Sequence, residues 1–67
     1  MDKLKRVLFE ETKYCSEQLA ECKRKFGEYD FVTSAFEYRY KALMEVIIMS
    51  DSVQEYCDWR AQLIEKG

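Results

Sequence analysis

Three cysteines are the side chains of this 67-residue sequence with the clearest capacity for chemistry: Cys15, Cys22 and Cys57. Cys15 and Cys22 are about two helical turns apart, roughly 10 Å, so they cannot form a disulfide bond within one helix. A structural zinc site needs closely spaced thiolate or imidazole ligands, whereas this sequence has no histidine and no CxxC pair. We therefore predict no metal site and interpret the cysteines as small apolar residues that let helices approach closely.

Catalytic chemistry has no better support in the sequence. There is no histidine, no glycine-rich loop and no nucleophile beside a base, so carboxylates alone would have to transfer protons. Glu45 is the only carboxylate within the apolar segment 42–49, and helical periodicity directs it away from the predicted core. We expect a protein that is not an enzyme and that binds no cofactor.

Charge gives the only indication of nucleic-acid binding. Basic residues cluster at 3–6 and 23–25, but several glutamates lie between these clusters and the net charge of the chain is -2. Such a balance usually produces a solvated helix face. Nucleic acid is therefore not the expected partner. A small nucleic-acid-associated regulator, acting as a dimer that brings the basic ends together, is the alternative function.

The elements that carry these residues are predicted to be helices. The chain has no proline and only two glycines, and it is rich in residues that favour helices. The first helix should span about 2–26 and end at Gly27 in a left-handed conformation. The second should span 31–49 and begin behind an N-cap at Asp30.

A third helix is predicted from 53 to 65, because Ser52 and Glu55 have the spacing of a capping box. The predicted fold is all-α, a single domain over 1–67. In it, the first two helices form an antiparallel hairpin and the short third helix covers the remaining apolar edge of the second. The apolar arcs of the second and third segments are in phase, so one long helix from Phe31 to Glu65, in a dimeric two-helix hairpin, is the alternative architecture.

The predicted core combines one stripe of the first helix with apolar residues of the other two. Its members are Leu4, Leu8, Cys15, Leu19, Cys22, Phe26, Phe36, Leu43, Val46, Ile47, Val53, Leu63 and Ile64. Phe9 projects from the opposite side of the first helix, among charged residues, so we expect it to be exposed.

The middle of the sequence resembles the small co-chaperones of type III secretion needle subunits. The resemblance rests on a central turn followed by a helix with Lys-Ala-Leu at 41–43 and Val-Ile-Ile at 46–48, and it covers about 19–49. It implies a helical hairpin that pairs with a second helical chaperone and holds a needle subunit unpolymerised. Residues 27–30 and 56–60 depart from that family, so no site residues are carried over.

The apolar surface of the sequence exceeds what so short a chain can bury. A domain of this size buries only about 60% of its unfolded surface, and one helix face cannot hold all of segment 42–49. We therefore predict a non-catalytic protein–protein interaction module, an adaptor, chaperone-like protein or inhibitor that binds a helical partner through the second helix. The residues predicted to bind the partner are Phe31, Tyr38, Arg39, Ala42, Val46, Met49, Tyr56 and Trp59.

The predicted partner is a second copy of the chain, giving a homodimer, or a different helical protein. Arg39 has two interpretations, an anchor for a partner carboxylate or a side chain that reaches to water or to a glutamate of the first helix. No apolar run reaches the roughly 18 residues of a membrane span. An odd number of cysteines without paired spacing is typical of a reducing compartment, so we expect a cytoplasmic location.

Overall fold

Three helices account for most of the chain in the computed structural model, which describes residues 2–66. They are α1 (Lys3–Phe26), α2 (Phe31–Met49) and α3 (Val53–Lys66), and no described residue forms a strand. The all-α prediction is confirmed. Each helix begins and ends within one residue of its predicted position.

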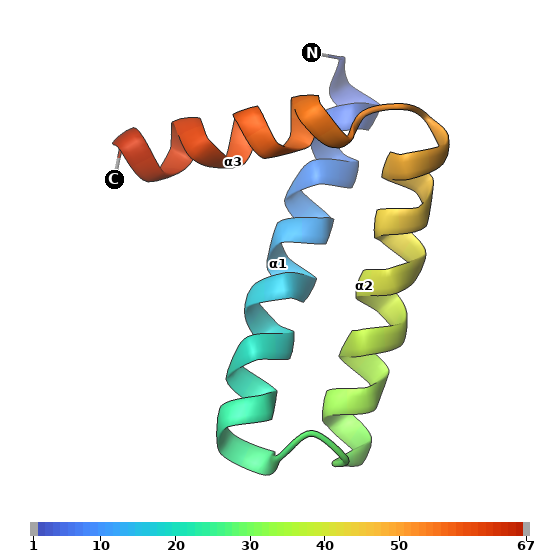
Figure 1. Cartoon of the computed structure of the whole chain (residues 1–67), viewed down its shortest axis with the longest axis vertical. Coiled ribbons are helices and arrows are strands. Elements are labelled where there is room, and N and C mark those ends of the chain that lie inside the picture. Colours follow the sequence, from blue (N-terminus) through green and yellow to red (C-terminus); the bar gives the residue numbers. More distant parts are fainter. Residues whose placement is uncertain (1, 67) are drawn as a thin grey trace.

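The helices form a pair with a third helix across one end (Figure 1). α1 and α2 lie side by side and run in opposite directions, and α3 crosses the N-terminal part of α1 and extends beyond it, away from α2. The molecule is accordingly flat, with extents of 35 × 28 × 17 Å. The third helix was expected along the apolar edge of α2, and the structure differs by placing it against α1.

Local side-chain signals set the helix ends. The side chain of Asp2 accepts a hydrogen bond from the backbone N–H of Lys5 (2.8 Å), and that of Asp30 accepts one from Val32 (3.0 Å). The predicted N-cap at Asp30 is therefore confirmed. Gly27 ends α1 with φ 90° and ψ 163°, a conformation open essentially to glycine alone. Its φ is positive as expected, but its ψ differs from that of the predicted left-handed helical residue.

A tight turn separates α2 from α3. Asp51 adopts a positive φ of 56°, which ends the helical path. The alternative of one continuous helix is therefore wrong. α3 begins where predicted, but the capping box does not form, because the Ser52 hydroxyl donates to the Ser50 carbonyl (3.2 Å) and the Glu55 carboxylate binds Lys5 of α1 (2.9 Å).

Small side chains line the contact between α1 and α2. The buried residues along it are Thr12, Cys15, Leu19 and Cys22 on α1 and Thr33 on α2. Short side chains let two helix backbones approach closely, as the sequence predicted for the cysteines. The Thr12 hydroxyl donates to the Leu8 carbonyl (2.7 Å), whereas Thr33 Oγ1 is buried without a hydrogen-bond partner among the described residues.

An aromatic cluster joins all three helices and forms the centre of the core. Phe9 of α1 and Ile47 of α2 are fully buried, and Tyr56 of α3 is nearly so. The Phe9 ring meets Tyr56 edge-on with ring centroids 5.2 Å apart and lies 5.7 Å from the ring of Trp59. The expectation that Phe9 is exposed is therefore wrong, because α3 covers the side of α1 from which it projects.

Other residues predicted for the core are exposed: Leu4, Phe26, Val46, Val53, Leu63 and Ile64. For Val46, Leu63 and Ile64 the cause is the same placement of α3, whereas Leu4 and Phe26 lie at the two ends of α1 and Val53 at the start of α3. Because α3 lies against α1, it leaves one apolar edge of α2 open to solvent, and its own C-terminal half extends past the helix pair.

Candidate docking surface on α2

The second helix presents apolar residues on two opposite faces. Thr33, Tyr40 and Ile47, spaced seven apart, mark the face toward α1 and the core. The opposite face carries an apolar row that we call the outer stripe: Phe31, Ala35, Tyr38, Ala42, Val46 and Met49. Phe31 is 85% exposed, Tyr38 78% and Met49 80%. An exposed row of this length on so small a chain is typical of an interaction site.

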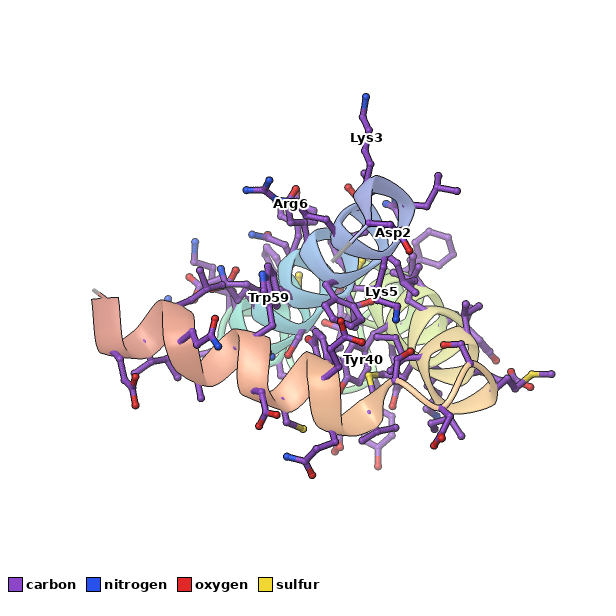
Figure 2. All side chains as sticks on the ribbon, turned by 90° about the horizontal axis from the view of Figure 1, so that it is seen from above. Asp2, Lys3, Lys5, Arg6, Tyr40 and Trp59 are labelled. Atoms are coloured by element: carbon purple, nitrogen blue, oxygen red, sulfur yellow. The ribbon has the colours of Figure 1, made fainter. Side chains whose placement is uncertain are left out.

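The outer stripe is open because α3 lies against α1, where polar contacts add to the packing of Tyr56 and Trp59 on Phe9. Lys5 Nζ lies 2.9 Å from the Glu55 carboxylate, and the hydrogen bond between them raises the pKa of Lys5. One turn further along α3, Arg60 Nη1 donates to Ser16 Oγ of α1 (3.5 Å). Lys5 and Trp59 both lie between α1 and α3 (Figure 2). These contacts leave the far side of α2 without an intrachain neighbour among the described residues.

Paired charges border the outer stripe on both sides. Arg39 Nη2 lies 3.5 Å from Glu11 of α1, and Lys41 Nζ lies 3.6 Å from Glu37 of α2. Of the two interpretations of Arg39, the structure therefore favours the side chain that reaches to a glutamate of the first helix. Glu45 is the one charged residue that interrupts the stripe itself, and it is exposed.

Apolar surface continues from the outer stripe around the end of α2. A shallow hollow of about 680 Å³ lies between the start of α1 and the end of α2. Leu4, Leu8 and Val46 form its apolar walls, and Asp2, Lys3, Lys5 and Ser50 complete its lining. Lys3 and Arg6 extend outward on the side of α1 away from α3 (Figure 2). Val46 belongs both to the hollow and to the outer stripe, so the two form one surface.

The structure brings together five of the eight residues predicted to bind a partner. Phe31, Tyr38, Ala42, Val46 and Met49 lie on the outer stripe, and Arg39 lies at its border. The other two belong elsewhere, because Tyr56 is buried in the core and Trp59 packs against it.

Three apolar residues of this surface were missing from the predicted set: Ala35 of the outer stripe, and Leu4 and Leu8 of the hollow. Ala35 lies four residues after Phe31 and three before Tyr38, a spacing that places it on the same helix face. That signal was present in the sequence. Leu4 and Leu8, by contrast, were assigned to the core; Leu8 is partly buried, and Leu4, in the first turn of α1, is 83% exposed.

The basic clusters of α1 are largely neutralised by nearby carboxylates. Lys5 pairs with Glu55, whereas Arg24 and Lys25 both contact Glu21, at 2.6 Å and 3.2 Å. The hydrogen bonds from Arg24 and Lys25 hold the pKa of Glu21 below its ordinary value. Because the clusters lie at opposite ends of one helix, they do not form a continuous basic surface.

Residues 2–66 contain no cluster of side chains that could ligate a metal ion. No three cysteine, aspartate or glutamate side chains in this range converge to hold a metal ion. Cys15 and Cys22 are buried and Cys57 is exposed. Among the described helices, none is both long and apolar enough to cross a membrane.

Burial raises the pKa of the Tyr56 phenol, but its hydrogen bond from Arg60 (3.3 Å) marks a structural role.

Comparisons with protein-family models, with curated proteins and with solved structures give no match to this chain.

Proposed function

We propose that this protein is a non-catalytic interaction module that binds a helical partner along the outer stripe of α2. The observation that carries the proposal is the exposure of Phe31, Tyr38 and Met49 on one face of one helix. Aromatic side chains are among the residues that contribute most binding energy at protein interfaces. The antiparallel α1–α2 hairpin is the scaffold that holds the face straight.

The spacing of the outer stripe supports a helix as the partner element. Steps of three and four residues form a row parallel to the helix axis, which matches the apolar row of another amphipathic helix. The paired charges at Arg39 and Lys41 give this row polar borders, as in helix pairs that meet along an apolar seam. An adaptor, an inhibitor, or a chaperone of a helical subunit, as the resemblance at 19–49 implies, would all use such a surface.

Site-specific photo-crosslinking in the native host tests this proposal. p-Benzoylphenylalanine is placed at Tyr38, on the outer stripe, and in a matched control at Glu17, an exposed position of α1 that lies on the face away from α2. We expect covalent adducts after irradiation of the Tyr38 variant and none above background from the Glu17 variant. Equal adduct yields from the two positions, or none from Tyr38, would contradict the proposal.

A further inference from the structure

We propose that the outer stripe binds the outer stripe of a second copy of this chain, with the two α2 helices antiparallel. This inference rests on the proposed function and names its partner, its orientation and its register. In this register Phe31 faces Met49 of the partner subunit, Tyr38 faces Ala42 of the partner subunit, and Glu45 faces Ala35 of the partner subunit. Each of these contacts occurs twice, because the interface has a two-fold axis.

The first argument for a second α2 helix as the partner is the heptad spacing of the apolar residues of α2. Phe31, Ala35, Tyr38, Ala42 and Met49 follow one another at steps of four, three, four and seven residues, and Glu45 occupies the seam position within the last step. Repeats of this period produce a seam that faces a second helix with the same period. The seam residues are exposed along the whole of α2, so a second copy can reach them without any change in this chain.

Glu45 and the two alanines decide the orientation. In a parallel pair each seam residue meets its own copy, so Glu45 would face the identical carboxylate, and unpaired like charges in an interface are costly. In the antiparallel pair Glu45 faces the methyl group of Ala35 of the partner subunit and can turn toward solvent. The antiparallel pair also sets Tyr38 over Ala42 of the partner subunit, so that a large side chain fills the space left by a small one.

The charges that border the stripe tolerate this arrangement. The two-fold axis passes close to Arg39 and Lys41, so each of these residues approaches its own copy. Both already lie within 3.6 Å of a carboxylate of their own chain, Glu11 for Arg39 and Glu37 for Lys41. Each cation therefore reaches the axis together with its own carboxylate. A cation of one subunit can then pair with a carboxylate of the other, and this attraction offsets the repulsion between the like charges.

The exposed area is sufficient for a specific dimer. A fully buried aromatic side chain contributes roughly 150–250 Å². With Phe31, Tyr38 and Met49 each at least 78% exposed, and with Val46 and the alanines, each copy can bury on the order of 600 Å². The total of about 1,200 Å² reaches the lower end of the range for stable protein interfaces.

Sedimentation equilibrium on the purified protein tests the self-association. We expect the wild-type chain to dimerise in the micromolar range and Ala42→Glu to weaken the dimer by about tenfold or more, because it places an unpaired charge at the centre of the seam. Ala20→Glu is the matched control, since it makes the same change at an exposed position of α1. It should dimerise like wild type. All three should keep the same helix content by circular dichroism.

A pair of single-cysteine substitutions tests the orientation in a Cys57→Ser background, since Cys15 and Cys22 are buried. A mixture of Ala42→Cys and Tyr38→Cys should form a mixed disulfide under mild oxidation. Ala42→Cys alone should not, because its two copies are offset by about 6 Å along the axis in addition to the helix separation. Efficient disulfide formation by Ala42→Cys alone would indicate a parallel pair and overturn the inference.

The two proposals fail in different ways. A wild-type chain that stays monomeric to about 1 mM, or one whose dimer is unaffected by Ala42→Glu, overturns self-association through the outer stripe. Photo-crosslinking at Tyr38 to a foreign protein would then still support the docking surface. Adducts at about twice the 8.1 kDa mass of one chain, lost in the Ala42→Glu variant, support both.

Discussion

Truncation of Phe9 is the sharpest test of how this chain is stabilised. Phe9 is fully buried between helices that are distant in sequence, with ring centroids 5.2 Å from Tyr56 and 5.7 Å from Trp59. Replacing a buried phenylalanine by alanine removes its transfer free energy and leaves a cavity, a loss of about 3–5 kcal/mol. A single small core rarely supplies more than about 3–5 kcal/mol in total. Phe9→Ala should therefore unfold most of the molecules at room temperature.

The assay is urea unfolding, followed in parallel by far-ultraviolet circular dichroism and by the fluorescence of Trp59. Phe9→Leu serves as a milder variant that stays folded, and it should lose about 1–1.5 kcal/mol. Trp59 is the only tryptophan, so its emission reports directly on the contact between α1 and α3. Both signals should shift together if the three helices unfold as one unit.

Phe26→Ala is the matched control, because it makes the same change at the other end of α1. Phe26 is 58% exposed, so its loss should cost less than about 1 kcal/mol. The periodicity of the sequence alone predicts the reverse order, with Phe26 in the core and Phe9 exposed. A variant series in which Phe26→Ala is as damaging as Phe9→Ala would refute the assignment of the core and with it the position of α3.

Three further predictions concern single side chains. Thr33→Val should raise the free energy of unfolding by about 1 kcal/mol, because it removes a buried hydroxyl that has no hydrogen-bond partner among the described residues. Thr12→Val should give no such gain, because the Thr12 hydroxyl donates a hydrogen bond to the Leu8 carbonyl. Thermal unfolding of the two variants and the wild type measures the difference. Asp51→Val should cost about 1–2 kcal/mol more than Asp51→Gly in urea titrations, because φ is 56° there and a β-branched residue strongly disfavours positive φ. Burial raises the pKa of Tyr56, so the folded state favours the protonated phenol. The stability that the buried phenol contributes is therefore fully present below the ordinary tyrosine pKa of about 10, and it is lost as pH rises through the folded-state pKa. Tyr56→Phe should remove this part of the alkaline loss, measured by unfolding at a series of pH values, and an unchanged slope would contradict the assignment.

The helix boundaries were accessible from the sequence because local groups determine them. Asp2 and Asp30 accept hydrogen bonds from N–H groups two or three residues later, and Gly27 supplies a conformation that other residues avoid. Such contacts involve only a few neighbouring residues. The turn at Asp51 is also local. The apolar periodicity of α2 and α3 is compatible with one continuous helix, but the positive φ of Asp51 ends the helix there.

The core was less accessible because α1 has two buried faces. Thr12, Cys15 and Leu19 lie toward α2, and Phe9 lies on a second face toward α3. Periodicity identifies the longer apolar stripe, whereas the second face carries Lys5 and other polar residues beside a single phenylalanine and is recognisable only once α3 is in place. The same limit explains Tyr56 and Trp59. Their residue types are typical of an interface, and they do form one, but within the chain.

The position of α3 separates folding from docking in this molecule. Tyr56 and Trp59 complete the core around Phe9, so substitutions there act on stability first. Tyr38 and Ala42 project from the opposite side of α2, where the structure holds no intrachain partner for them among residues 2–66. Their substitution should change the free energy of unfolding of the monomer by no more than about 0.5 kcal/mol, the usual range for surface positions. A loss of association in these variants can therefore be read as a property of the surface itself, independent of the fold that presents it.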